Sequence, residues 1–407
     1  MQQFIEMRTQ KMALNKQSIR DLNEKSVLRQ IFVEGPISRI QISRNLKLNK
    51  STVSAIFNDL SDRQLVMEMG QGQSTQVGGR KPVMIKVNQK YGYTLNFDIG
   101  FRHLDMMANY LDGTAFQYTR FETAGYNINQ VLDLIIESVN NFKNPDTVNG
   151  LLGISVAVHG IVYQNQVTYS PFIDMEDVSI YERLTATFTV PIVVDNEANL
   201  VAVFQRDFSH DEEHNMNNIV VISIHKGIGA GIIINHQIYR GEKGEAGEIG
   251  RAIYPTVFAE PGRVEKIENY ASQDAIIDLI KNEKKLDELD FDDVAQMYSD
   301  GDKVVVKAID DFRDYITMIV YNAAVSYNPD TIYLSSNLIE TIDQLLPMIN
   351  NQYNLLPENG NTDIRMLRGA KYASLLGGCS SVTHLALKMS GQQLKFNFDL
   401  NAAGIIE

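Results

Sequence analysis

The stretch "YTLNFDIGFRHLDMMANYLDGTAFQYTRFET" (Tyr93–Thr123) decides the fold of most of this chain. It contains three runs rich in apolar residues that are joined by short turns, and the second run ends in an Asp-Gly pair typical of a hairpin. Next, "INQVLDLIIESVNNF" (Ile128–Phe142) has the spacing of an amphipathic helix, and "LLGISVAV" (Leu151–Val158) is again an apolar strand. Strands that alternate with helices in this way predict the α/β class.

The same pattern begins again near Asn218. There "NIVVISI", "GIGAGIIIN" and "QIYRG" predict a second strand meander, and a helical stretch follows from about Gly301 to Asn328. This weak internal duplication predicts two α/β lobes, residues 91–215 and 216–407, with a cleft between them. The C-terminal segment either stays with the second lobe or returns to the first.

The composition is that of a globular protein with a divided charge. The 407 residues suffice for two or three domains, no apolar run is long enough to span a membrane, and the one cysteine excludes a disulfide framework. We therefore expect a cytoplasmic protein. Residues 1–90 carry 15 Lys and Arg against 7 Asp and Glu, whereas the rest of the chain carries 22 against 43. This basic head favours a polyanionic partner, although chance variation among solvated faces is the alternative.

Residues 1–90 have the element order of a winged helix-turn-helix domain. Helical spacing in "NEKSVLRQIFVEG" (Asn23–Gly35), "SRIQISRNL" (Ser38–Leu46) and "KSTVSAIFNDLSDRQL" (Lys50–Leu65) predicts three helices. Two alternating runs follow in Val66–Asn88, around a polar tip rich in glycine, and they predict a β-wing. A three-helix bundle that binds another protein is the alternative, but helix, turn, helix and basic wing together favour DNA.

The third predicted helix places short donors and acceptors on its outer face, a set suited to base edges and phosphates in the major groove. The wing adds two basic residues at its tip. We expect DNA to be contacted by Lys50, Ser51, Thr52, Ser54, Asn58, Arg80 and Lys81.

Several motifs in order carry a family resemblance over nearly the whole chain. They are "DIG" (Asp98–Gly100), "VDNEANLVAV" (Val194–Val203), "GIGAGIIINHQIYRGEKGEAGEIGR" (Gly227–Arg251), "ENYAS" (Glu268–Ser272) and "YNPDTIYLSS" (Tyr327–Ser336). The chain resembles the ROK family (repressors, open reading frames and sugar kinases), and within it the N-acetylglucosamine and xylose repressors. The resemblance implies an N-terminal winged helix-turn-helix followed by a two-lobed actin/hexokinase-like domain.

The motifs depart from those of the family's kinases at the phosphate-binding positions. The first phosphate turn continues as Phe101-Arg102-His103, and the second is His225-Lys226-Gly227, which lacks the family's threonine. Glu197 stands where the kinases have their catalytic Asp, and one extra methylene displaces a base that must be positioned accurately. Ser335-Ser336 replaces the Gly-Gly next to the adenosine. Together these changes predict that the chain is not an enzyme.

The sugar-binding positions are better preserved. By resemblance, Asn196, Glu197, Glu248 and Glu268 hydrogen-bond sugar hydroxyls, and carboxylates and amides suit that task because they accept or share hydrogen bonds with vicinal hydroxyls. Two alternatives remain open. Glu197 begins a helix and has a place there as a partner of the helix dipole, and Glu268 is otherwise a solvated charge.

The family's zinc-binding segment has lost its ligands here. "PGRVEKIENYAS" (Pro261–Ser272) contains none of the family's three cysteines, and Arg251 replaces its histidine. Structural zinc needs four nitrogen or sulfur ligands, so we expect no metal and no cofactor. Arg251 either pairs internally with Glu248 or Glu268 or reaches an anionic ligand, and we expect the internal ion pair. Lys226 adds positive charge if it faces the cleft.

These observations predict a sugar-responsive DNA-binding repressor of carbohydrate metabolism genes, xylose metabolism among them. The expected partners are operator DNA and a sugar or sugar phosphate inducer, bound by a homodimer or homotetramer without a membrane partner. An active sugar kinase that carries a DNA-binding domain is the alternative, and a scaffold that sequesters a transport component is a third.

Overall fold

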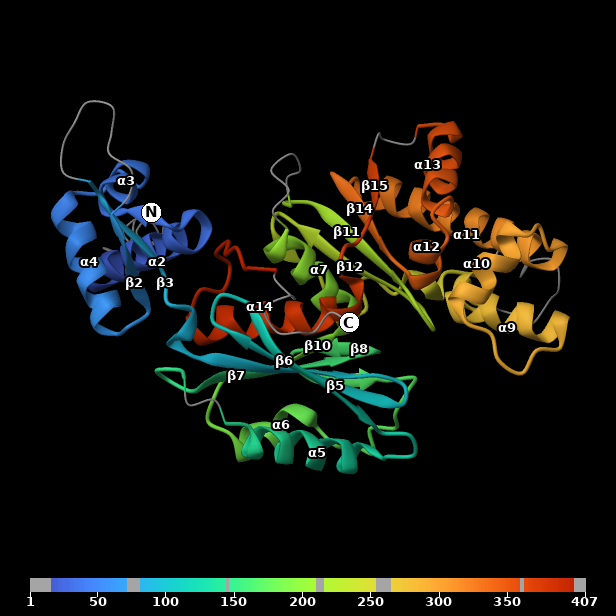
Figure 1. Cartoon of the computed structure of the whole chain (residues 1–407), viewed down its shortest axis with the longest axis horizontal. Coiled ribbons are helices and arrows are strands. Elements are labelled where there is room, and N and C mark those ends of the chain that lie inside the picture. The colour runs from blue at the N-terminus through green and yellow to red at the C-terminus, as the bar shows by residue number, and fades with distance from the viewer. Residues whose placement is uncertain are drawn as a thin grey trace, which may run out of the picture.

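The computed structural model describes residues 16–71, 81–143, 146–209, 216–253, 265–358 and 362–398. In its described N-terminal residues, 16–71 and 81–90, three helices and a three-stranded sheet of order β1-β3-β2 have the arrangement of a winged helix (Figure 1). The first helix begins earlier than its apolar pattern predicts, and the two-residue strand β1 was not predicted at all. The elements are α2 (Lys16–Glu34), β1 (Ile37–Ser38), α3 (Arg39–Asn45), α4 (Lys50–Asp62), β2 (Val66–Gln71) and β3 (Val83–Val87).

The first lobe has a five-stranded sheet of order β10-β7-β4-β5-β6. Strands β4, β7 and β10 are parallel, whereas β4, β5 and β6 form an antiparallel meander. All seven residues of β4 are buried because helices cover both faces of the sheet. Its elements are β4 (Tyr93–Ile99), β5 (His103–Tyr110), β6 (Ala115–Glu122), α5 (Ile128–Asn141), β7 (Leu151–Val158), β8 (Ile161–Tyr163), β9 (Gln166–Tyr169), α6 (Ile180–Thr187) and β10 (Ile192–Asn196).

The second lobe repeats this plan, with strand order β13-β12-β11-β14-β15. Strands β11, β12 and β13 form the meander, and β14 and β15 add parallel strands. The duplication read in the sequence is therefore present in the sheets. The elements are β11 (Ile219–Ile224), β12 (Ile228–Ile234), β13 (Gln237–Ile238), α8 (Glu268–Ala271), α9 (Gln273–Lys284), α10 (Phe291–Ser299), α11 (Lys303–Tyr327), β14 (Thr331–Ser335), α12 (Asn337–Thr341), α13 (Leu345–Leu355) and β15 (Asp363–Met366).

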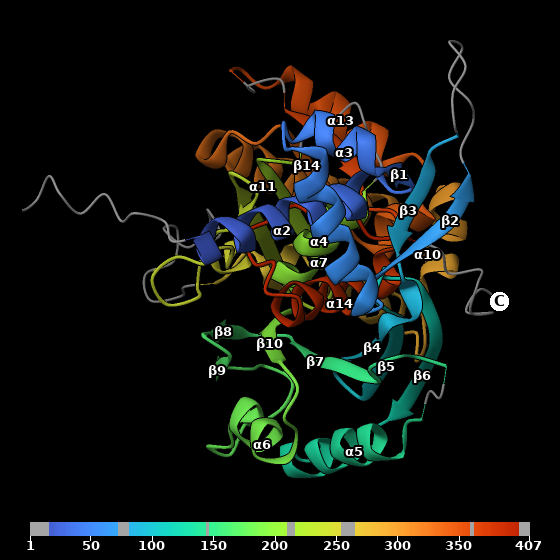
Figure 2. The same cartoon turned by 90° about the vertical axis from the view of Figure 1, so that its left-hand side faces the viewer.

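Two helices lie between the sheets, α7 (Glu197–Phe208) and α14 (Ala373–Ala386) (Figure 2). The C-terminal helix α14 contacts β4 and β7 of the first lobe, and α7 contacts β11 and β12 of the second. Glycines permit this close packing. A Cβ at Gly377 of α14 would lie 1.8 Å from a backbone oxygen of α7, and one at Gly231 of β12 would lie 2.2 Å from another. In the described part of the chain no helix combines the length and hydropathy needed to cross a bilayer.

Candidate functional site

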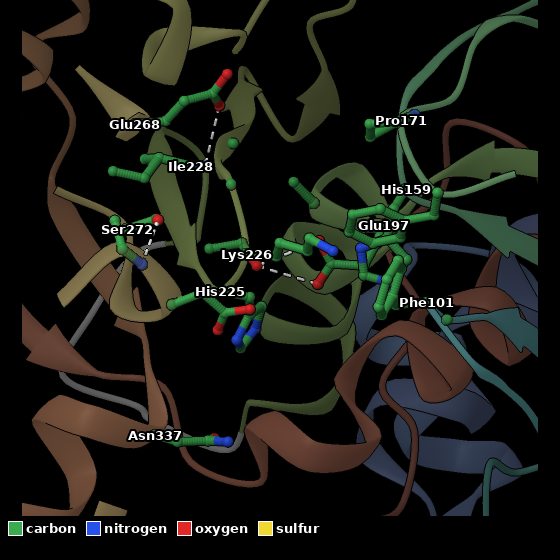
Figure 3. A pocket seen from close by; sticks show the side chains of 18 of the residues that line it. Phe101, His159, Pro171, Glu197, His225, Lys226, Ile228, Glu268, Ser272 and Asn337 are labelled. Carbon is green, nitrogen blue, oxygen red and sulfur yellow. Dashed lines mark hydrogen bonds between the residues drawn. The ribbon is translucent and has the colours of Figure 1, made fainter. Parts of the chain in front are cut away.

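A cleft of about 1500 Å³ lies between the two lobes, where the carboxyl ends of β4, β10 and β11 meet the loops that follow them (Figure 3). Such strand ends are the usual place for ligands in α/β folds. The residues predicted to bind a ligand come from three separate stretches of sequence, and the structure brings them all to this one cleft. They are Asn196, Glu197, Glu248, Arg251 and Glu268.

Asn196 and Glu197 stand at the start of α7. The side-chain oxygen of Asn196 caps the helix by accepting a hydrogen bond from the backbone N–H of Asn199 at 3.2 Å, and its amide nitrogen donates to the carbonyl of Gly160. The buried carboxylate of Glu197 accepts from the hydroxyl of Ser223 on β11, at 3.1 and 3.2 Å. Asn196 therefore also has a structural role as a cap, and Glu197 is held by a strand of the second lobe.

Asp98, at the end of β4, forms a charged group that sequence reasoning missed. Its carboxylate accepts a hydrogen bond from the hydroxyl of Ser374 on α14 and lies 3.3 Å from Nε2 of His159. Burial alone would lower the pKa of His159, but the charge and hydrogen bond of Asp98, aided by the charge of Glu197, raise it to about 9. Burial would likewise raise the pKa of Asp98, yet His159 and Ser374 hold it below its usual value. The raised pKa of His159 favours its charged imidazolium form beside the Asp98 carboxylate.

Arg251 forms an ion pair with Glu248, its Nε lying 3.0 Å from the carboxylate, and its guanidinium carbon lies 5.2 Å from the ring centre of Tyr169 in the first lobe. Of the alternatives for Arg251, the structure has the internal pair. Burial raises the pKa of Glu248, the charge of Arg251 opposes the rise, and the nearby carboxylate of Glu268 adds to it. Burial and Glu268 thus make Glu248 a weaker acid than a free glutamic acid side chain.

Glu268 is held at the mouth of the β11–β12 turn. The backbone N–H of Ile228 donates to its carboxylate at 3.5 Å, and the ammonium of Lys266 lies 3.4 Å away (Figure 3). Neither contact uses all the lone pairs of the carboxylate, so acceptors remain for a ligand hydroxyl.

The β4–β5 turn and the β11–β12 turn contact each other across the cleft. The ammonium of Lys226, in the β11–β12 turn, lies 3.2 Å from the ring centre of Phe101, in the β4–β5 turn, and 5.4 Å from that of Phe172. The two rings stand edge to face, 5.7 Å apart. Lys226 therefore does face the cleft, and it bridges the lobes through a cation–π contact.

The side chain of Gln273 connects the β11–β12 turn with the Ser335-Ser336 pair at the end of β14. Its oxygen accepts from the hydroxyl of Ser336 at 3.2 Å and from the backbone N–H of Asn337 at 3.1 Å, and its nitrogen lies 3.4 Å from Nδ1 of His225. Burial lowers the pKa of His225, which favours the neutral imidazole. Polar side chains thus occupy this corner of the cleft.

No group of three or more His, Cys, Asp and Glu side chains that could hold a metal ion occurs in the described part of the chain. Of the segment that resembles the family's zinc-binding segment, Pro261–Ser272, residues 261–264 lie outside the described residues.

The predicted DNA-binding residues lie on α4 and beside the wing. Lys50, Ser51 and Asn58 are exposed, whereas Thr52 and Ser54 are half-buried. The opposite face of α4 packs into the core of the winged helix. Lys81 is exposed just before β3, and Arg80 lies outside the described residues.

Comparison with known proteins adds a family to this geometry. The ROK family model matches residues 94–377. The xylose repressor of Lactiplantibacillus pentosus is 38% identical over 385 residues, which cover 94% of this chain and 98% of that one. The xylose repressor of Staphylococcus xylosus is also 38% identical, over 91% of this chain and 97% of its own.

Solved structures share the fold at lower identity. A ROK family transcriptional regulator described as a homologue of the E. coli MLC protein superimposes with a TM-score of 0.74 at 21% identity, over 91% of this chain and 98% of that one. A ROK glucokinase from Streptomyces griseus gives 0.60 at 19% identity over 71% of this chain and 99% of its own. The two-lobed fold is thereby confirmed, and the chain belongs to the ROK family, as its motifs predict.

Proposed function

We propose that this chain is a transcriptional repressor that binds operator DNA through its winged helix and is released by xylose bound between the lobes. The observation that carries the proposal is the alignment with the two xylose repressors, because it runs through both the DNA-binding part and the sugar-binding part of the chain. The carboxylates gathered in the cleft supply the matching chemistry. The cytoplasm is the compartment in which such a protein meets its operator.

The charge of the cleft favours a neutral sugar over a sugar phosphate. Among the described residues that line it, nine are Asp or Glu and five are Lys or Arg. The carboxylates of Glu197, Glu248 and Glu268, which line the cleft, would repel a phosphate and can accept hydrogen bonds from sugar hydroxyls.

The residues of the β4–β5 and β11–β12 turns support the proposal that the protein has no kinase activity. Phe101 and Lys226 fill the space between the two turns with an aromatic ring and an alkyl chain, where phosphoryl transfer needs open backbone N–H groups. Gln273 and Ser336 occupy the neighbouring corner. The active sugar kinase is the second candidate, because solved kinases share this fold.

Two-fold symmetry would let two winged helices reach two operator half-sites, so the proposal includes a homodimer or homotetramer and a palindromic operator. A single experiment tests the central claim. Full-length protein is first used to select its own binding site from a random duplex library, and anisotropy of the selected duplex is then titrated with D-xylose, D-glucose and D-xylose 5-phosphate.

We expect D-xylose alone to release the duplex and to raise the melting temperature, because a ligand that binds only the folded state stabilises it. Failure to select any duplex would contradict the repressor. Selection without release by a sugar would contradict the sensor.

A further inference from the structure

Helix α7 reaches from the cleft to the boundary with the winged helix. Its first residue, Glu197, lines the cleft, and its last residue, Phe208, packs in a continuous core that also contains residues of the winged helix. The twelve residues of this helix correspond to about 18 Å of length. One rigid helix thus contacts both the cleft and the core that includes the winged helix, the two sites that a ligand sensor must couple.

The packing of α7 leaves it little freedom to bend. Its backbone meets Gly377 of α14 on one side and Gly231 of β12 on the other, at separations that leave no room for a side chain. Since α14 packs on the first lobe and β12 belongs to the second, any relative movement of the lobes must displace α7 against one of them.

The C-terminal end of α7 meets a short segment that follows α14. We define this coupling segment as residues 393–398. Phe396 is its central residue: it is fully buried, its ring stacks 5.3 Å from that of Phe208, and its backbone N–H donates to the carbonyl of Asp207 at 2.9 Å. The segment is therefore attached to the last turn of α7 by both a ring contact and a hydrogen bond.

The other side of the coupling segment contacts the first helix of the winged helix. The ring of Phe396 lies 6.0 Å from that of Phe32 on α2, and Arg29 of α2 donates to the side chain of Gln393 at 2.6 Å. Figure 1 shows this part of the chain, after α14, running between the first lobe and the winged helix.

Helix α2 in turn is attached to α4, the helix predicted to contact DNA bases. Arg63, which follows α4, pairs with Glu24 of α2 at 2.6 Å, and Arg20 pairs with Asp59 of α4. The two helices also share one apolar core. A shift of α2 would therefore move α4 with it.

We propose that the coupling segment, through Phe396, transmits occupancy of the sugar pocket at the start of α7 to the position of the winged helix. The inference rests on the proposed function and names its route. It makes Phe396 a positioning residue, since it contacts neither sugar nor DNA. Because linkage is reciprocal, a sugar that weakens operator binding through this route must itself bind more weakly to the DNA complex by the same factor.

The test compares two variants of the full-length chain with a matched control. Phe396→Leu weakens the packing against both rings while keeping the site apolar, and Gln393→Ala removes only the hydrogen bond to Arg29. Phe142→Leu makes the same aromatic change on the far side of the first lobe, where Phe142 packs 5.3 Å from Tyr93. For each protein, affinity for the selected duplex is measured with and without saturating D-xylose, and D-xylose affinity is measured without DNA.

In the parent we expect D-xylose to weaken DNA binding by a factor of roughly 5 to 150, the usual range of allosteric coupling. In Phe396→Leu that factor should fall at least threefold, and in Gln393→Ala by less, while each separate affinity stays within about threefold of the parent. A merely structural role would lower both affinities or the melting temperature and leave the factor unchanged. Phe142→Leu should keep the parent's factor.

If the Phe396→Leu protein binds both DNA and D-xylose, and D-xylose weakens its DNA binding by the parent's factor, the proposed route through Phe396 is wrong. Should that variant not fold, Gln393→Ala decides, and an unchanged factor there overturns it equally. A parent protein that binds DNA but shows no response to D-xylose refutes the proposed function instead, so the two failures are distinguishable.

Discussion

The ammonium of Lys226 lies over the ring of Phe101, 3.2 Å from its centre, and the two residues belong to different lobes. The contact joins the β4–β5 turn to the β11–β12 turn, the two turns whose motifs depart from those of the family's kinases. Both residues are exposed, so the contact is a surface one. A cation–π contact in such surroundings contributes about 0.5–1 kcal/mol, which suffices to bias the lobes without locking them.

A double-mutant cycle measures this bridge. We expect Lys226→Met and Phe101→Leu each to lower the free energy of unfolding in urea, and the double variant to lose about 0.5–1 kcal/mol less than the sum, because each single change already removes the contact. Lys243→Met, at another exposed lysine of the second lobe, paired with Phe101→Leu serves as the control and should be additive. Additive losses for Lys226 and Phe101 would show that no such contact exists in solution.

The same contact between Lys226 and Phe101 underlies the proposal that the protein has no kinase activity. Purified protein incubated with ATP, magnesium and either D-xylose or D-glucose should release ADP no faster than protein without sugar, because the side chains of Phe101 and Lys226 meet between the two turns where phosphoryl transfer needs open backbone N–H groups. Mass spectrometry for sugar phosphate checks the result. Turnover that disappears in Glu197→Gln would establish the kinase and refute the proposal.

The histidinium of His159 predicts a dependence of stability on pH. Its pKa is about 9 in the folded chain and about 6.5 when unfolded, so its pairing with Asp98 stabilises fully below about pH 6.5 and is lost as the pH rises through 9. The free energy of unfolding should fall by up to about 3 kcal/mol across that window. Urea unfolding between about pH 6 and pH 10 measures the fall.

Two variants identify the group responsible for this pH dependence. His159→Gln should flatten the profile. His236→Gln should leave it unchanged, because burial holds the pKa of His236 below 6.5 and it does not titrate in that window. A profile in which His159→Gln keeps the full fall would assign the titration to another group.

Much of this fold can be predicted from the sequence because its signals are local. Apolar periodicity locates α4, α5, α11 and the strands of both meanders to within a few residues, and the repeated strand pattern predicts two lobes. Strand β1 was missed because two residues carry no periodicity, and only its pairing with β3 makes it a strand. The early start of α2 was missed because its first turns are polar and partly exposed.

Only those residues of the candidate site that lie within family motifs could be predicted from the sequence. Glu197, Glu248 and Glu268 were found by resemblance, and the structure brings them to one cleft. The group around Asp98 was not found, because its partner Ser374 lies 276 residues away in sequence and no spacing rule relates the two. The contact of Lys226 with Phe101 was missed for the same reason.

The outer face of α4 should divide into residues that supply affinity and residues that supply sequence preference. Lys50→Ala or Lys81→Ala should weaken binding to all duplexes and reduce the salt slope by about 0.9 for each phosphate that the variant no longer neutralises. Asn58→Ala should instead change which base is preferred, at a cost of about 1–3 kcal/mol on the selected duplex. Anisotropy at several salt concentrations measures both effects, with Lys303→Ala of the second lobe as the control. Equal losses on every duplex for Asn58→Ala would remove it from base recognition.

The last prediction concerns Glu248 and its partner Arg251. Glu248→Gln keeps the shape of the side chain but removes its charge, so a sugar hydroxyl loses a strong acceptor. D-xylose affinity should then fall by about 1–3 kcal/mol, or roughly 5- to 150-fold, while operator binding stays intact. Glu245→Gln is the matched control, because Glu245 is exposed and its carboxylate lies 3.9 Å from Arg251. Unchanged release by D-xylose in Glu248→Gln would exclude this pocket as the sensor.

Arg251→Ala then separates the two roles open to the guanidinium. If Arg251 holds Glu248 in place through their 3.0 Å ion pair, Arg251→Ala weakens D-xylose binding. The double variant Arg251→Ala/Glu248→Gln should then bind D-xylose no worse than Glu248→Gln alone, because Glu248→Gln already removes the ion pair. If Arg251 instead contacts an anionic group directly, D-xylose affinity is unchanged and only binding of D-xylose 5-phosphate falls. Calorimetric titration of both sugars against the four proteins distinguishes these outcomes. The stacking of Arg251 near Tyr169 and its pairing with Glu248 favour the brace.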